Sequence, residues 1–212
     1  MNQMDGETNQ RAPRFHLMCI TPDASERSLA TAVQLATELP RQSIAIQIRD
    51  KSASASHLYA FSKQLRHLTG TQGCKIVINR YVDIALASHA DGVQLPERGI
   101  PASIAQQNFS RLWVGRSCHD GEGLSNARFA DWATLSPFAD SPGKAPALTR
   151  KQFTDWTRNS PVPVFALGGI HIGNAAEALR SGAHGIAAIR SVFHAQDPVQ
   201  AAFGLLESIE VN

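Results

Sequence analysis

A short segment of the sequence places an amide and two cations where an anionic ligand could be bound. The segment Gln47-Ile48-Arg49-Asp50-Lys51 ends an apolar run. Alternation along a strand puts Gln47 and Arg49 on the same face, with Lys51 just beyond them in the loop. Two cations and an amide suit a phosphorylated or otherwise anionic ligand. A solvent-exposed segment without a ligand is the alternative, and this segment alone does not decide between the two.

A second candidate anion site lies further along the chain. Gly168 and Gly169 end an apolar run and precede a predicted helix, and Ile189 and Arg190 end the next such run. Glycines let the backbone approach an anion, and a helix N-terminus offers free N–H groups and a partial positive charge. The glycines could instead serve only a tight turn. Their combination with Arg190 favours phosphate binding.

His119 is the candidate for proton transfer. It follows a strand-like run in the segment Gly115-Arg116-Ser117-Cys118-His119, and an imidazole can act as base or acid near neutral pH. A lone loop histidine is more often a surface or helix-capping residue, so position alone does not make His119 catalytic. Cys118 is not expected to form a thiol–imidazole pair with it, because adjacent side chains point apart.

These candidates follow buried strands, and strand-like and helix-like patterns alternate along the whole chain. Connections of helix length between strands indicate a parallel sheet. Eight units predict an α/β fold, a single-domain (β/α)8 TIM barrel, whereas an open doubly wound sheet is disfavoured by the count. Because the carboxyl ends of barrel strands meet at one mouth, distant candidates can share a pocket. The predicted strands are 15–20, 43–49, 74–79, 91–95, 111–117, 131–136, 163–169 and 185–190.

Composition narrows the class of protein. The 212 residues carry a formal net charge of only +2 and no basic run, so nucleic acid is not an expected partner. No apolar run approaches about 18 residues and the N-terminus is polar, so we expect a cytoplasmic protein that does not enter membranes. Cys19, Cys74 and Cys118 are an odd number without CxxC spacing, which disfavours a disulfide framework or a zinc site. We expect residues 1–13 to be a flexible tail and 14–212 to form the barrel.

The loop predicted after the sixth strand spans residues 136–144 and is rich in turn-forming residues. It is long enough to reach over the mouth as a lid carrying Ser141 and Lys144. A plain connection between strand and helix is an equal alternative.

Together, these segments resemble the thiamin phosphate synthase/TenI family over roughly residues 15–207. The resemblance implies a (β/α)8 barrel that binds a small phosphorylated thiazole. The matching segments are Gln47-x-Arg49-x-Lys51 (the pyrophosphate-contacting motif), Asn79 with 82–86, Asp91-Gly92-Val93, Gly168-Gly169-Ile170, and 185–190 (the phosphate cup).

Differences from the family separate its branches. The synthase branch joins a pyrimidine diphosphate to a thiazole phosphate and holds magnesium with two aspartates. This chain has Arg80 at one matching position and the segment 96–99 (Pro-Glu-Arg-Gly) at the other. A guanidinium cannot coordinate Mg²⁺, which needs oxygen ligands, and only Glu97 could supply one. In the loop after the sixth strand, the segment Ser141-Pro142-Gly143-Lys144 matches only half of the motif of the synthase branch.

Two other segments, Gln94-Leu95-Pro96 and Gly115-Arg116-Ser117-x-His119, resemble the TenI branch. That branch aromatises a thiazole carboxylate phosphate tautomer without a metal, and the resemblance implies His119 as its proton-transfer residue. We therefore expect a thiazole tautomerase without cofactor, in which Gln94 and Ser117 contact the substrate.

Two other functions remain open. A thiamin phosphate synthase with an altered metal site would need magnesium, and a sensor or regulator would bind a phosphate ligand without turnover. Barrels of this size often pair, so a homodimer is possible.

Overall fold

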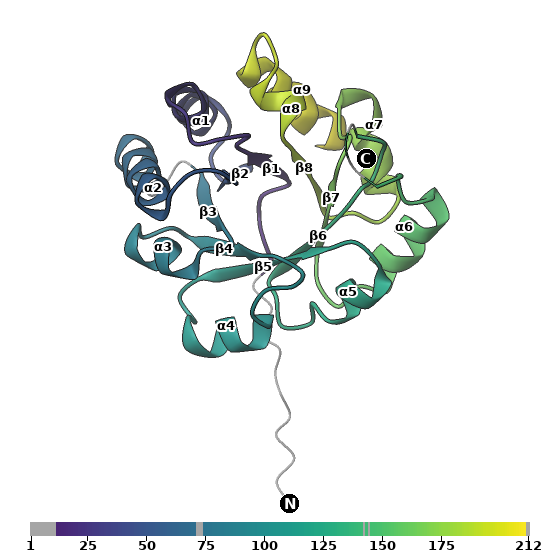
Figure 1. Cartoon of the computed structure of the whole chain (residues 1–212). Coiled ribbons are helices and arrows are strands. Elements are labelled where there is room, and N and C mark those ends of the chain that lie inside the picture. Colours follow the sequence, from purple (N-terminus) through teal and green to yellow (C-terminus); the bar gives the residue numbers. More distant parts are fainter. Residues whose placement is uncertain (1–11, 71–73, 142, 144, 211–212) are drawn as a thin grey trace, which may run out of the picture.

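The computed structural model describes residues 12–70, 74–141, 143 and 145–210 (Figure 1). In this part of the chain, eight parallel strands form a closed barrel in sequence order, and β8 pairs with β1. The predicted (β/α)8 barrel is therefore confirmed. The strands are β1 (Leu17–Ile20), β2 (Ile44–Ile48), β3 (Lys75–Asn79), β4 (Gly92–Leu95), β5 (Trp113–Cys118), β6 (Trp132–Leu135), β7 (Val164–Leu167) and β8 (Gly185–Ala188).

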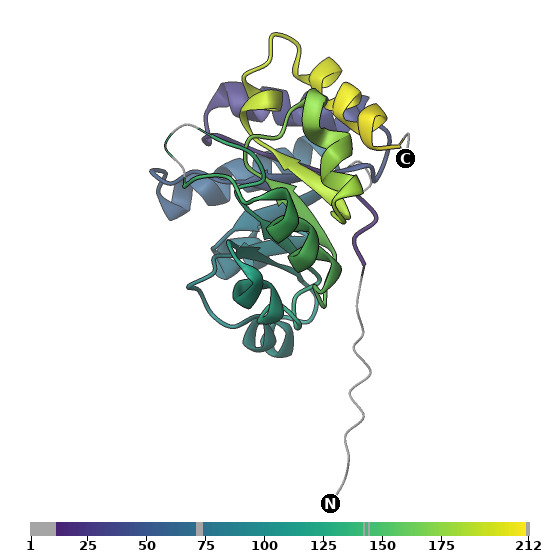
Figure 2. The ribbon, with the colours of Figure 1, turned by 90° about the vertical axis from the view of Figure 1, so that its right-hand side faces the viewer.

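Helices surround these strands on the outside, as the view along the barrel shows (Figure 1). Figure 2, turned by 90°, shows the helices of the second half of the chain lying over the strands from the side. The helices are α1 (Glu26–Glu38), α2 (Ala55–Thr69), α3 (Val82–Ala87), α4 (Ala102–Asn108), α5 (Gly121–Ser125), α6 (Arg150–Arg158), α7 (Ile172–Arg180), α8 (Arg190–Phe193) and α9 (Pro198–Glu210).

Local signals set where helices begin. The side chains of Ser25, Ser54 and Asp120 cap α1, α2 and α5 by accepting a backbone N–H of the first turn. Thr149 and Gln152 form a reciprocal capping box at α6. Pro198 begins α9, where its fixed φ suits the first helical position. None of the helices in the described ranges is long and apolar enough to cross a bilayer.

Apolar side chains fill much of the interior of the barrel. Phe15 stacks on Phe165 and meets Trp132 edge-on. A larger apolar layer lies between the strands and the helices. The buried members of the inner cluster are Phe15, Met18, Ile20, Ala45, Val77, Trp132, Phe165 and Ala187.

At their carboxyl ends, the predicted seventh and eighth strands each extend two residues too far. The predicted strand 185–190 is two residues too long, because β8 ends at Ala188 and Arg190 already begins α8. β7 likewise ends at Leu167, since Gly168 and Gly169 both have positive φ. Most of the predicted flexible tail, residues 1–11, lies outside the described residues, and Pro13 within it is buried.

Candidate active site

An inward-facing amide on β2 has hydrogen-bonding capacity that the protein does not use. Gln47 is 3% exposed, and its Nε2 donates to Asn79 Oδ1 on β3 at 3.1 Å. Its Oε1 is buried without a partner among the described residues. Leaving a buried carbonyl oxygen unpaired costs free energy, which a donor on a bound ligand would recover. The structure thus brings the predicted residues Gln47 and Asn79 together at the mouth.

The cations after β2 lie on a loop that is held in place by Thr21 and Asp50. The Thr21 hydroxyl accepts the N–H of Arg49 at 2.9 Å and donates to its carbonyl oxygen at 3.0 Å. Asp50 accepts the N–H groups of Ala24 at 2.9 Å and Ser52 at 2.7 Å. Burial alone would raise the pKa of Asp50, but these hydrogen bonds outweigh it and lower the pKa to about 2.

The side chains on this loop remain available to a ligand. Arg49 is half-buried and Lys51 is exposed. Neither forms an ion pair with another described residue. Both predicted cations therefore lie just after β2 without a carboxylate partner in the part of the chain that the structure describes.

The turn after β7 needs its two glycines. Gly168 has φ +97° and Gly169 has φ +64°, in the region that favours glycine. A Cβ at position 169 would lie 2.8 Å from the backbone of Ala139 in the loop after β6. The N–H of Ala139 donates to Gly168 O at 3.0 Å, and Asn174 donates to Gly169 O at 2.9 Å. The glycines are thus required by packing, and this packing shapes the predicted phosphate cup.

The two helix N-termini beside this turn differ in how they are capped. His171 caps α7, where its Nδ1 accepts the N–H of Gly173 at 3.1 Å. Ile189 precedes α8 and makes no side-chain capping hydrogen bond. Arg190 is exposed at the start of α8, and the buried Oγ of Ser191 has no partner in the described chain. The beginning of α8 therefore has more unused capacity for a phosphate, and Ser191 is a residue that the sequence reasoning missed.

His119 is held by a glutamate from the neighbouring strand end. Its Nδ1 lies 2.9 Å from Glu97 Oε2, and its backbone N–H donates to Glu97 Oε1 at 3.2 Å. Arg116 donates to the carbonyl oxygens of Glu97 and Ile100, at 2.6 and 2.9 Å, and so fixes the loop that carries the glutamate. A carboxylate beside Nδ1 favours the tautomer with its hydrogen there, which leaves Nε2 as the available base. Sequence reasoning did not assign this role to Glu97, although Glu97 and His119 follow adjacent strands.

The remaining predicted residues have different environments. Gln94 is buried on β4 and its Nε2 donates to Ser117 Oγ on β5 at 3.1 Å. Ser141 is half-buried in the loop after β6, and Lys144 lies outside the described residues. Burial raises the pKa of the Cys118 thiol to about 12, which leaves it a poor nucleophile.

The loop after β6 is attached to the barrel at its start. The N–H of Phe138 donates to Leu167 O at 2.8 Å, which continues the pairing with β7, and the N–H of Leu148 donates to Pro137 O at 3.0 Å. Phe138 is buried against Phe153. These contacts fix the loop after β6 at both of its ends. A lid formed by the residues between them stays a prediction.

The residues at the mouth do not fit the magnesium site of the synthase branch. Arg80 follows β3 where one aspartate is expected, and it is exposed. The Glu97 carboxylate already accepts the backbone N–H of His119 and lies 2.9 Å from its Nδ1. Among the described residues no cluster of three or more His, Cys, Asp and Glu side chains could hold a metal ion. Neither of the two positions therefore offers a free carboxylate of the kind that the synthase branch uses to hold Mg²⁺.

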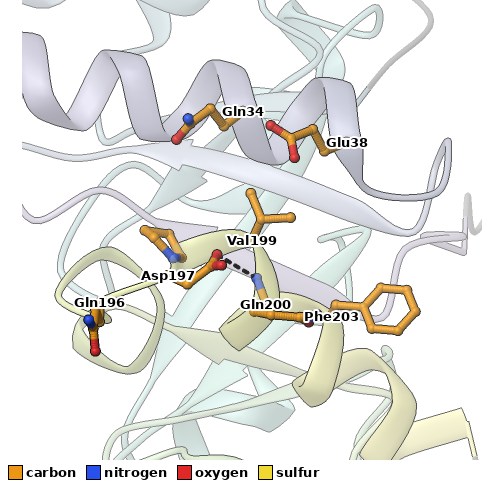
Figure 3. A pocket seen from close by; sticks show the side chains of 8 residues that line it. Gln34, Glu38, Gln196, Asp197, Val199, Gln200 and Phe203 are labelled. Atoms are coloured by element: carbon orange, nitrogen blue, oxygen red, sulfur yellow. Dashed lines mark hydrogen bonds between the residues drawn. The ribbon is translucent and has the colours of Figure 1, made fainter.

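A groove of about 570 Å³ lies elsewhere on the molecule, on the outer surface between α1 and α9. Figure 3 shows Gln34 and Glu38 on α1 along one side of the groove, and Asp197, Val199 and Phe203 on the opposite side. Asp197 accepts the N–H of Gln200 at 3.0 Å. The groove contains none of the predicted site residues, so the mouth of the barrel remains the candidate site.

Comparison with known proteins agrees with the barrel fold. A family model described as "Thiamine monophosphate synthase" matches residues 17–192. A Geobacter sulfurreducens protein whose name as a thiamine-phosphate synthase is provisional is 39% identical over 167 residues, covering 76% of this chain and 78% of that protein. The thiamine-phosphate synthase of Albidiferax ferrireducens is 31% identical over 94% of this chain and 93% of its own. The solved thiamine phosphate pyrophosphorylase of Pyrococcus furiosus superimposes with a TM-score of 0.80 at 29% identity, covering 93% and 96% of the two chains.

Proposed function

The chain belongs to the thiamine-phosphate synthase/TenI family of thiamin biosynthesis. Within this family, we propose that it is a thiazole tautomerase. Its substrate would be a phosphorylated thiazole carboxylate, and its reaction a proton transfer that needs no metal. The observation that carries this proposal is the 2.9 Å contact between His119 Nδ1 and Glu97 Oε2. The same carboxylate is thereby engaged with a histidine at a position where the synthase branch would need a metal ligand.

Substrate binding would begin with the phosphate. The Gly168–Gly169 turn, the uncapped start of α8 and the exposed Arg190 offer N–H donors and a cation on one side of the mouth. Fixing the phosphate there holds the thiazole ring in one orientation, which is the condition for a single base to reach a chosen carbon.

Proton transfer would then use the free nitrogen of His119. Nε2 takes a proton from the ring carbon, and the resulting imidazolium returns a proton to another carbon of the same ligand, so no atom is gained or lost. Glu97 faces the imidazolium and stabilises its positive charge. Because Glu97 also holds Nδ1, the ring stays oriented through both steps.

A thiamin phosphate synthase is the second candidate, and the comparisons favour it. The relatives carry that name, and none of those cited is named as a tautomerase. Against it stands the donor set of the mouth, where Arg80 and the engaged Glu97 replace the expected aspartates. The two reactions share a phosphorylated thiazole as ligand, so the same phosphate-binding turn suits both.

One pair of assays on the purified protein separates these candidates. Aromatisation of the thiazole carboxylate phosphate tautomer is followed in EDTA, and coupling of the pyrimidine diphosphate to the thiazole phosphate is followed with Mg²⁺. The tautomerase proposal predicts rapid aromatisation in EDTA and no coupling. Coupling without aromatisation would establish the synthase instead. Binding of the phosphorylated thiazole without either reaction would identify a sensor.

A further inference from the structure

Gln94 and Trp132 contact each other across the strand that separates them. In the barrel register Gln94 on β4 pairs with Gly115 on β5, and Gly115 pairs with Trp132 on β6. The Trp132 indole N–H passes over the glycine and donates to Gln94 Oε1 at 2.9 Å. A Cβ at position 115 would lie 2.2 Å from Gln94 Oε1 and 2.4 Å from Trp132 Nε1. Glycine at position 115 therefore makes this contact possible.

The indole fixes the orientation of the Gln94 amide. The two ends of a glutamine amide have nearly the same shape, but an indole N–H can only donate, so the atom that faces it must be the oxygen. Nε2 then faces Ser117 Oγ at 3.1 Å and Thr134 Oγ1 at 3.3 Å, with one N–H for each. Gln94 and Trp132 are each 1% exposed, so water does not compete for these bonds.

The Ser117 hydroxyl accepts a hydrogen bond from Gln94, and its own O–H remains available as a donor. No further hydrogen bond to Ser117 Oγ is found within the described ranges. Ser117 is half-buried near the carboxyl end of β5, two residues before His119. Its hydroxyl hydrogen is thus free to point into the mouth.

We propose that Trp132 is a positioning residue that acts through Gln94 and makes Ser117 a hydrogen-bond donor to an acceptor oxygen of the bound ligand. A carboxylate or another anionic oxygen is favoured there, because a ligand N–H or O–H would face a second donor. The inference rests on the proposed function in taking a thiazole carboxylate phosphate as the ligand.

A double-mutant cycle between Trp132→Phe and Ser117→Ala tests this inference. Trp132→Phe keeps an aromatic ring and removes the N–H. Trp113→Phe is the matched control, because Trp113 packs in the same interior cluster and its indole has no hydrogen bond within the described residues. The dissociation constant of the thiazole carboxylate phosphate is measured by calorimetry for each variant.

Each single substitution is expected to weaken binding about tenfold, the size of one hydrogen bond to a charged acceptor. The double variant should bind no more weakly than either single variant, and Trp113→Phe should stay within about twofold of the wild type. Independent losses that multiply in the double variant would overturn the inference, since Ser117 would then act without Trp132.

A second variant covers the case in which Trp132→Phe does not fold. In Gln94→Met, the amide that donates to Ser117 Oγ is absent, so the Ser117 hydroxyl is no longer held with its hydrogen toward the mouth. Ser117→Ala should then have no further effect on binding in this background, and a further tenfold loss would contradict the inference.

The two proposals fail in different ways. Binding without aromatisation would overturn the tautomerase, while the cycle would still decide the role of Trp132. Aromatisation with independent losses would overturn only the role of Trp132. A wild type that does not bind the compound at all would overturn both.

Discussion

At the amino end of the barrel, Asp91 and Asp131 stand directly before β4 and β6, and other protein groups bind them. Asp91 accepts the N–H of Ile76 at 2.9 Å and pairs with Arg66 and Lys75. Asp131 accepts the N–H of Val114 at 2.6 Å. These carboxylates tie neighbouring strands together. Their position explains why the Asp91-Gly92-Val93 segment can be a family signature without contacting a ligand at the mouth.

Charges at the carboxyl end of the barrel are arranged differently. Arg49, Lys51 and Arg190 lie at the mouth, and none of them forms an ion pair with another described residue. In barrels the amino end serves stability and the carboxyl end serves chemistry. The mouth also contains satisfied carboxylates, such as Asp50 and Glu97, so what distinguishes it is its open cations, and these favour the carboxyl end as the proposed site for an anionic ligand.

The largest expected effect is at the carboxyl end. His119→Gln removes the proposed base and should lower the turnover number for aromatisation about 10²- to 10⁴-fold. Because the side chain is largely exposed, the free energy of unfolding should change by less than about 0.5 kcal/mol. His67→Gln, an exposed histidine on α2, is the matched control. Turnover above about a tenth of the wild-type value would contradict the role of His119.

At the amino end we expect the reverse pattern from Asp91→Ala. It removes a part-buried carboxylate bound by two cations and a backbone N–H, and should lower the free energy of unfolding by about 2–3 kcal/mol in urea denaturation. The kinetic constants for aromatisation should stay within about twofold. Asp155→Ala, which breaks an exposed ion pair with Lys151, should have no measurable effect on stability. A large loss of turnover in Asp91→Ala would remove the distinction between the two ends.

Gly169→Ala tests whether the turn after β7 is shaped for phosphate. The added Cβ meets Ala139 and the positive φ is strained, so the free energy of unfolding should fall by about 1–2 kcal/mol. Affinity for inorganic phosphate, measured by calorimetry, should fall several-fold because the turn must shift. Gly70→Ala is the control, since Gly70 has φ +65° with nothing within 4 Å of its added Cβ. Unchanged phosphate affinity in Gly169→Ala would place the phosphate site elsewhere.

The smallest expected effect concerns Asp50, a carboxylate at the mouth that supports the loop and not the ligand. Its pKa in the folded protein is lowered to about 2 from an ordinary value of 3.8. It therefore stabilises the fold fully above about pH 4, and this contribution is lost as the pH falls through 2. Because solvent screens this group, we expect roughly 1 kcal/mol.

Denaturant unfolding of wild type and Asp50→Asn between pH 5 and pH 2 measures this contribution. The wild type should be more stable at pH 5, and the difference should shrink toward pH 2. A difference that does not vary with pH would show that Asp50 acts through shape and not through charge.

The fold could be predicted from local patterns, and the same patterns give the proposed location of the site. Each strand is a short apolar run with a polar end, and a parallel barrel brings such ends to one mouth. This reasoning correctly placed Gln47, Asn79 and His119 at strand ends. Boundaries near β7 and β8 were less predictable, because turn and short-helix backbones follow the apolar runs without a break in composition.

Partners across strands could not be predicted in the same way. The contact between Trp132 and Gln94 depends on the register of three strands and on the missing side chain of Gly115. The pairing of Glu97 with His119 depends on how the loops after β4 and β5 approach each other. Both are long-range relations, and a single sequence contains no direct signal for either.

The central claim, that the ligand binds at the carboxyl end and leaves the amino end untouched, is tested most directly by one NMR titration. The ¹⁵N-labelled protein is titrated with the thiazole carboxylate phosphate, and the backbone amide shifts are mapped onto the barrel. We predict shifts at Gly168, Gly169, Arg190 and His119, with Asp91 unchanged. Shifts confined to the amino end, or to the groove between α1 and α9, would contradict the account.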